Sequence, residues 1–123
     1  MNEPTPAESA SKNLEENLKK ALTEFIMLSL LAERECYIGQ MTAMIEERSE
    51  GKLSLVFPYA AVYRLLDSGH IADVGKRFAP DGRRRQYYSI TDSGRAYLCT
   101  LQRTCDNFFA SMRAILAPKE EDT

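Results

Sequence analysis

A small, mainly α-helical domain with one β-hairpin (class α+β) is the fold that the sequence predicts. The chain has only 123 residues, and apolar residues recur at three- and four-residue spacing through most of it. Between about residues 71 and 90 this spacing changes to alternation. A chain of this length forms one domain, which excludes large multi-domain enzymes.

The N-terminal third is expected to contain a short arm and then a helix. Residues 1–12 carry no apolar run, so we expect a disordered arm rather than a signal peptide. The helix is expected to begin at Asn13, where Glu16 can complete a capping pair, and to run to about residue 32. Its apolar stripes consist of Leu14, Leu18, Leu22, Phe25, Ile26, Leu28 and Leu31.

Two shorter helices are expected next. One follows Gly39 and continues to about Ser49. The other is signalled by Pro58, a favoured first-turn residue, and is ended by Ser68-Gly69. Its buried face is expected to present Val62, Leu65 and Leu66.

The C-terminal half is expected to form a hairpin and a long helix. The strands around residues 71–78 and 86–90 are separated by the turn sequence Ala79-Pro80-Asp81-Gly82, and Thr91 can cap a helix that runs to Leu116. Three helices followed by a hairpin are typical of a winged helix-turn-helix, which would span residues 13–90. A C-terminal dimerisation helix would then span 91–117 and an acidic tail 118–123.

The positive charge is concentrated where such a fold would meet DNA. The formal net charge of −2 argues at first against a nucleic-acid-binding protein. Between Lys52 and Arg95, however, eight basic residues face four acidic ones, so this segment carries +4 and the remainder −6. We therefore expect DNA contacts from the basic residues of the hairpin, which are Lys76, Arg77, Arg83, Arg84 and Arg85. The alternative is that this charged turn is merely solvated.

The third helix is expected to be the reading helix. The face opposite the buried one would present Ala60, Arg64 and Asp67, flanked by Phe57 and Tyr63. Arg64 is a candidate for contacting a base or a phosphate. Tyr59 and Tyr63 are candidates for DNA contact as well, and the alternative is that they close the core as half-buried aromatics, more so for Tyr59.

The last helix carries a continuous apolar seam that predicts dimerisation. Its members are three or four residues apart: Leu98, Leu101, Cys105, Phe108, Met112 and Ile115. Leu14 and Leu18 begin a similar seam on the first helix, so the two helices can cover each other, a second copy, or both. A two-fold dimer would present two reading helices to successive major grooves.

Other classes of function lack the residues that they need. His70 is the one histidine of the chain and follows a glycine, so we expect no Ser-His-Asp site and no enzyme. The three cysteines form no C-x-x-C pair, so neither a metal site nor a disulfide framework is expected, and no cofactor motif is present. The longest apolar stretch is too short to cross a membrane, and the expected location is the cytoplasm.

The sequence resembles the PadR family of bacterial winged-helix transcriptional regulators from about Asn13 to Leu116. The resemblance rests on FIMLSLLAE in the first helix, on Tyr37 and Gly39, on Tyr59 with the following AAVYRLLDSGHI, and on RRRQYYSITDSGRAYL after the hairpin turn. It implies a homodimeric repressor that binds a double-stranded DNA operator. The short C-terminal helix is similar to that of the small members of the family.

The resemblance also implies that a small aromatic or drug-like molecule binds near the dimer interface, where it releases the DNA. Tyr97, Phe108, Phe109 and Met112 could line such a site, although a stripe of this kind is more often plain core. The alternative function is a protein-interaction module or a ligand sensor that does not bind promoter DNA. It is favoured by Val56-Phe57-Pro58, which stand where the family usually has Gly-Thr-Leu before the tyrosine.

Overall fold

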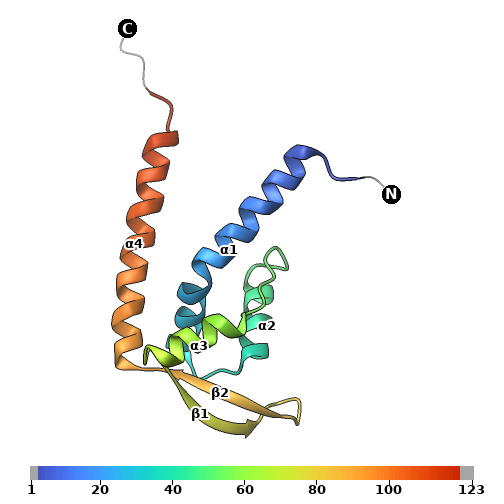
Figure 1. Ribbon diagram of the computed structural model, residues 1–123, viewed down its shortest axis with the longest axis vertical. Coiled ribbons are helices and arrows are strands. Elements are labelled where there is room, and N and C mark those ends of the chain that lie inside the picture. Colours follow the sequence, from blue (N-terminus) through green and yellow to red (C-terminus); the bar gives the residue numbers. More distant parts are fainter. Residues whose placement is uncertain (1–2, 120–123) are drawn as a thin grey trace.

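The predicted order of elements is confirmed by the computed structural model, which describes residues 3–119 (Figure 1). Within this range the hairpin and the two short helices gather at one end, and the two long helices rise from them as arms. The elements are α1 (Pro6–Glu33), α2 (Ile38–Arg48), α3 (Tyr59–Asp67), β1 (Ile71–Phe78), β2 (Arg84–Ile90) and α4 (Asp92–Leu116).

The first helix begins earlier than the sequence predicts. Helix α1 starts at Pro6, so the expected disordered arm and the expected start at Asn13 are wrong for residues 6–12. Thr5 and Glu8 form a reciprocal capping box, in which each side chain accepts a hydrogen bond from the backbone N–H of the other residue. Proline at the first helical position completes this start. The acidic residues 120–122 of the expected tail lie outside the described residues.

The core lies between the second half of α1, the two short helices and the base of the hairpin. Met27, Leu28 and Leu31 of α1 are fully or almost fully buried there. On α3, Val62 and Leu65 are 2% and 1% exposed, which confirms the predicted buried face of that helix. Their burial fixes which side of α3 remains available to solvent.

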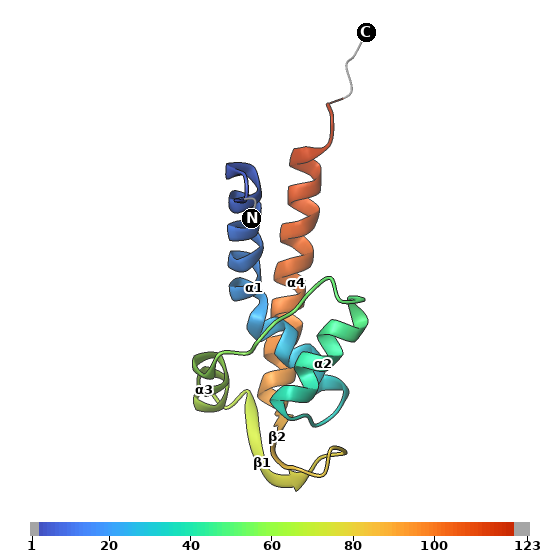
Figure 2. The same ribbon diagram turned by 90° about the vertical axis from the view of Figure 1, so that its right-hand side faces the viewer.

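The hairpin is bent by a β-bulge that alternation in the sequence did not reveal. Strands β1 and β2 are antiparallel, and the register shifts between Asp73 and Gly75. Gly75 has a φ of +95°, a value that favours glycine, and its N–H donates to the Asp73 carboxylate at 2.8 Å. Such a bulge increases the local bend of a strand. The hairpin, or wing, therefore curves away from the helices (Figure 2).

Helix α4 starts against the end of α3. Thr91 caps it as predicted, because its hydroxyl accepts a hydrogen bond from the N–H of Gly94 at 3.0 Å. A Cβ atom on Gly94 would lie 2.0 Å from the carbonyl oxygen of His70. Glycine is therefore required here by the close approach of two backbone segments.

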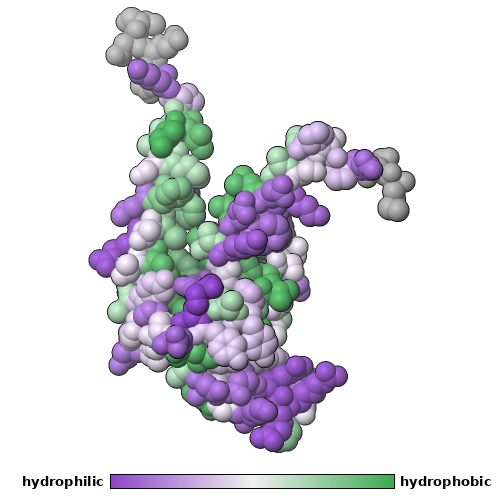
Figure 3. Space-filling view, viewed as in Figure 1, coloured by the Kyte–Doolittle hydropathy of each residue, from purple (hydrophilic) through white to green (hydrophobic). Residues whose placement is uncertain are grey.

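The two long helices separate as they leave the core. Figure 1 shows the N-terminal half of α1 and the C-terminal half of α4 diverging like the arms of a V, and Figure 2 shows that both arms extend away from the hairpin. Apolar residues line α4 and the side of α1 that faces it, whereas hydrophilic residues gather on the wing at the opposite end (Figure 3). The apolar arms and the charged wing thus occupy opposite ends of the molecule.

Candidate nucleic-acid interface

Helix α3 presents a pair of aromatic rings to solvent. Tyr59 and Tyr63 are 74% and 62% exposed, and their ring centroids are 5.7 Å apart. The alternative that these rings close the core is therefore wrong for both. Phe57, which we expected beside them on the outer face, is instead 4% exposed and belongs to the core. It lies before the first turn of α3, where helical spacing does not determine its direction.

The pair lies next to the wing and to the start of α2. A shallow hollow of about 190 Å³ is lined by Tyr59, by Tyr37 and Gly39 at the N-terminus of α2, and by Arg85 and Gln86 of β2, among others. The free N–H groups at a helix N-terminus carry partial positive charge and favour phosphate. Three elements therefore meet on one surface at the lower end of the molecule. Tyr37 and Gln86 were not predicted from the sequence to belong to the site.

The outer half of the wing carries cations that have no carboxylate partner among the described residues. Lys76, Arg83 and Arg84 are exposed and take part in none of the ion pairs found among residues 3–119. Phe78, which pairs across the hairpin with Arg84, is 75% exposed. An exposed aromatic ring among arginines can insert at a minor groove. Phe78 was missed by sequence reasoning, although an aromatic residue within a basic strand is a visible signal.

The other predicted basic residues are engaged with carboxylates of the same chain. Arg77 pairs with Glu35 at 2.5 Å and Arg64 pairs with Glu24 at 2.9 Å. Arg77 also stands over the ring of Tyr87 at 5.3 Å. These arginines link elements of the domain to one another. They are not freely available on the surface that Tyr59 helps to form.

Arg85 and Asp81 hold the turn of the wing. The Arg85 guanidinium donates to the Asp81 carboxylate at 2.8 Å and stands over the Tyr37 ring at 5.5 Å. The N–H of Arg83 donates to the other oxygen of Asp81 at 3.0 Å. The hydrogen bond from Arg85, followed by that from Arg83, lowers the pKa of Asp81 below its usual range. Through Arg85 the turn is thereby linked to the Tyr37 ring at the start of α2.

The residues predicted to form a dimer interface line the two arms of the V. The outer ones are strongly exposed: Leu14 60%, Leu18 47%, Phe108 64%, Met112 40% and Ile115 81%. Leu98, Leu101 and Cys105, nearer the core, are half-buried. Apolar exposure of this extent, continuous along two helices, is typical of surfaces that associate with another molecule. The two helices of one chain therefore do not cover the seam by themselves.

The four residues expected to bind an effector do not share a cavity within the described residues. Tyr97 lies near the start of α4, where its ring stacks on His70 at 4.4 Å and its hydroxyl donates to Glu24 at 3.3 Å. Phe108 lies eleven residues, or about 16 Å, further along the helix, together with Phe109 and Met112. The chain alone therefore does not assemble the expected site.

Features of other protein classes are not found in the described part of the chain. Residues 3–119 contain no group of three or more metal-ligating side chains, and no helix among them is long and apolar enough to span a bilayer. His70 donates to or accepts from Ser93 at 3.0 Å and stacks on Tyr97, so it has a packing role. The fold and its exposed reading surface define a winged-helix protein of the DNA-binding class.

The family follows from comparison with known proteins. Residues 27–100 match the model of the transcriptional regulator PadR-like family, which covers more than half of the chain, so the chain belongs to this family. Members of the family regulate transcription and are not enzymes. No protein with a curated description is significantly similar in sequence.

Solved structures share the fold at low sequence identity. A PadR family transcriptional regulator from Eggerthella lenta is 18% identical, with a TM-score of 0.76 over 98% of this chain and 100% of that chain. A PadR-like regulator from Bacillus cereus is 18% identical, with a TM-score of 0.69 over 84% of this chain and 99% of that one. A transcriptional regulator from Clostridium thermocellum is 24% identical, with a TM-score of 0.61 over 80% and 94%.

Proposed function

We propose that the protein is a homodimeric, sequence-specific repressor that binds an operator in double-stranded DNA in the cytoplasm. The observation that supports this proposal is the exposed pair Tyr59 and Tyr63 on α3, beside a wing with cations that take part in none of the ion pairs of residues 3–119. In the complex α3 lies in the major groove, and the wing reaches the phosphates or the minor groove. Tyr59 and Tyr63 contact bases or sugars, and Lys76, Arg83 and Arg84 contact phosphates.

The three engaged arginines have a second role in this proposal. Arg64, Arg77 and Arg85 add positive charge near the DNA, but their ion pairs mainly hold α3 and the wing in place. Positioning of this kind lowers the entropic cost of binding, because the contacting side chains are already oriented. The direct phosphate contacts then come from the wing tip.

In the proposed dimer, the second copy covers the exposed apolar seams of the two arms. A second copy can insert its own α4 between the arms and cover the seams begun by Leu14 and Leu98. Apolar helices that repeat at three- and four-residue spacing pack well in this way. The two wings would then point in the same direction, as two half-sites of an operator require.

A response to a small aromatic or drug-like molecule completes the proposal. Phe108, Phe109 and Met112 lie on the arm that the second copy covers, so an effector site there would be built from two chains. Tyr97 would contribute to the effector site only indirectly, through the hydrogen bond that its hydroxyl donates to Glu24 at 3.3 Å.

Affinity for the DNA upstream of the coding region, measured against salt concentration, tests the proposal. A dimer that contacts six phosphates should give a slope of about −5 in log affinity against log salt. The variant R83E/R84E should lower the affinity at least tenfold and make the slope shallower. The matched control R103E/R113E reverses two charges on α4, away from the apolar seam, and should bind like the wild type.

An interaction module that binds an acidic protein is the second candidate. Three of the six basic residues predicted to bind DNA are already paired with carboxylates, as Arg64 is with Glu24. A flat salt slope, or equal affinity for operator and random duplex, would favour this candidate over the repressor.

A further inference from the structure

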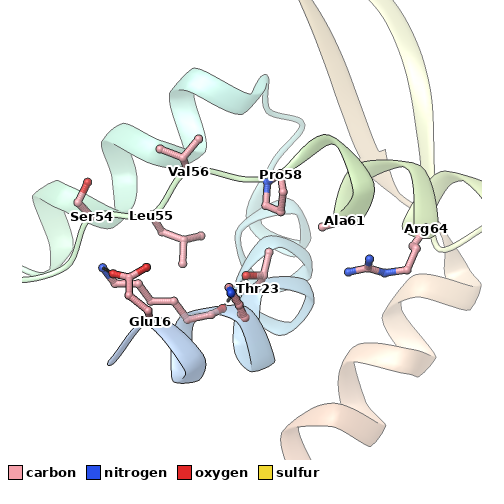
Figure 4. A pocket seen from close by; sticks show the side chains of 10 residues that line it. Glu16, Thr23, Ser54, Leu55, Val56, Pro58, Ala61 and Arg64 are labelled. Atoms are coloured by element: carbon pink, nitrogen blue, oxygen red, sulfur yellow. Dashed lines mark hydrogen bonds and ion pairs between the residues drawn. The ribbon is translucent and has the colours of Figure 1, made fainter. Parts of the chain in front are cut away.

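A groove runs between the middle of α1 and the segment that connects α2 to α3. Its volume is about 720 Å³, which lies in the range of small-molecule sites. Figure 4 shows Glu16 and Thr23 on α1 at one wall, Leu55 and Pro58 on the connecting segment at the other, and Arg64 reaching in from α3. The groove is separate from the surface formed by Tyr59 and the wing.

The two walls of the groove differ in chemistry. Leu55, Pro58 and Ala61 provide an apolar wall. Lys19, Lys20 and Arg64 provide three cations against one carboxylate, that of Glu16, so the lining carries a net positive charge. Lys19 pairs with Glu16 at 3.2 Å, whereas Lys20 belongs to no ion pair found among residues 3–119. A ligand with an apolar body and one negative group matches both walls.

The groove lies on the opposite side of α1 from the predicted dimer surface. At about 100° per residue, Glu16 and Thr23 lie roughly opposite Leu14 and Leu18 around the helix. A second copy that covers Leu14 and Leu18 therefore leaves the groove open. A ligand in the groove does not compete with dimerisation.

The groove also contacts the start of α3. Pro58 is the residue immediately before that helix, and Arg64 on its second turn lines the groove while it pairs with Glu24 at 2.9 Å. A negative group in the groove would compete with Glu24 for the Arg64 guanidinium. Occupation of the groove is thereby linked to the position of the helix that carries Tyr59 and Tyr63.

We propose that this groove binds a small amphipathic anion, a carboxylate on a short apolar body, and that its occupation shifts α3. The binding step stands by itself, whereas the consequence for DNA rests on the proposed function. Both parts follow from the apolar wall, the cationic wall and the place of Arg64 between groove and helix.

Calorimetric titration of the full chain with octanoate tests the binding step. Octylammonium has the same apolar body with the opposite charge, so we expect octanoate to bind saturably and octylammonium to bind at least about tenfold more weakly. Equal affinity for the two probes would overturn the proposal, because it would show that the cationic wall does not contribute. Failure of octanoate to bind at all would overturn it too.

Reversal of charge at the groove locates the site. We expect K19E/K20E to weaken octanoate binding by about tenfold or more. The control R103E/K119E changes the net charge equally but lies outside the groove, and it should bind octanoate like the wild type. Both lysines are on a helix surface, and thermal unfolding checks that the variant is folded. Unchanged octanoate affinity in folded K19E/K20E would place the ligand elsewhere and overturn the proposal.

The effect of octanoate on DNA binding is measured in a separate experiment. Saturating octanoate should change operator affinity by about threefold or more in the wild type and leave that of K19E/K20E unchanged. If octanoate binds but operator affinity stays the same, the link to α3 is overturned. If no DNA binds even without octanoate, the proposed function has failed, and the calorimetric result still decides whether the groove is a ligand site.

Discussion

Glu24 on α1 accepts a hydrogen bond from the Nε of Arg64 on α3 at 2.9 Å, and its other carboxylate oxygen accepts one from the hydroxyl of Tyr97 on α4 at 3.3 Å. One side chain thus joins the reading helix to both arms of the V. Arg64 lies about 100° around α3 from Tyr63, so this pairing directs it toward α1. Glu24 is therefore well placed to hold α3 at a fixed angle to the arms.

We expect Arg64→Ala to affect DNA binding less than Arg84→Ala. Arg64 is paired and is directed away from Tyr63, whereas Arg84 is exposed at the wing tip. Arg84→Ala should make the salt slope of a dimer shallower by about 2, one phosphate contact per protomer. Arg64→Ala should leave the slope unchanged and lower the free energy of unfolding by less than about 1 kcal/mol. A larger loss of slope for Arg64→Ala would show that Arg64 contacts phosphate directly.

Asp81→Asn should strengthen DNA binding. Asparagine keeps an oxygen that accepts the hydrogen bond from the Arg83 N–H, so the turn remains, but the ion pair with Arg85 is lost and one negative charge leaves the wing. Affinity measured by fluorescence anisotropy should rise about threefold at low salt, and the salt slope should become steeper. Weaker binding would mean that the pair with Arg85 positions the wing more than its charge opposes DNA.

The contribution of Asp81 to the order of the wing depends on pH. Its pKa is lowered, first of all by the hydrogen bond from Arg85, so the carboxylate favours the folded wing above the ordinary pKa of an aspartate. This contribution is lost as the pH falls through the lowered pKa. In Asp81→Asn the acid-side loss of wing order, followed by amide hydrogen exchange, should be correspondingly smaller.

Ile115→Asp and Phe108→Asp should each convert the protein to a monomer. Both side chains are exposed, at 81% and 64%, so aspartate does not disturb the fold of one chain but places a charge in the proposed seam. Light scattering at tens of micromolar should give the monomer mass. Asn107→Asp introduces the same residue on the other face of α4 and should stay dimeric. A wild-type monomer would contradict the proposed dimer.

Gly94→Ala should destabilise the fold strongly. The new Cβ would lie 2.0 Å from the carbonyl oxygen of His70, and neither backbone segment can move freely. We expect a loss of about 2–4 kcal/mol in urea unfolding. Ser93→Ala, which removes the hydroxyl beside His70 at 3.0 Å, is the neighbouring control and should cost much less. Equal stability of Gly94→Ala and wild type would show that α4 can shift away from His70.

Cys36 should resist alkylation, whereas Cys99 should react. Cys36 is buried, and this burial raises the pKa of its thiol above the ordinary 9.0. Iodoacetamide at pH 8 should therefore label Cys99 in the folded protein and Cys36 only in urea, as read by mass spectrometry. The folded state holds the Cys36 thiol proton more tightly than the unfolded state does. The protonated thiol therefore contributes to stability below pH 9.0, and this contribution is lost as the pH rises through the raised pKa of the folded state.

Much of the fold can be predicted because local sequence patterns determine where its helices begin and end. Apolar spacing marks α3, glycine at position 69 ends it, and Thr91 caps α4, as the structure confirms. These signals act over a few residues, so tertiary contacts do not overrule them. The start of α1 was misplaced because two capping pairs compete, and the pair of Thr5 and Glu8 is the one that forms.

The candidate site could be predicted only in part. Sequence position placed the wing arginines beside a turn, and Arg83 and Arg84 are indeed exposed there. It could not show that Arg64 pairs with Glu24, a residue forty positions away. Partners that are remote in the chain depend on how the helices and strands pack, and the local spacing of residues does not predict this packing.

The sequence by itself determined the order of elements, the basic wing and the apolar seams, because periodicity and turn chemistry are local properties. Only the tertiary structure decided which basic residues are free and which are held. It also placed Tyr59 in solvent and Phe57 in the core, and it opened the groove beside Lys20. These outcomes depend on distances between segments that are remote in the chain, and packing of the core alone fixes those distances.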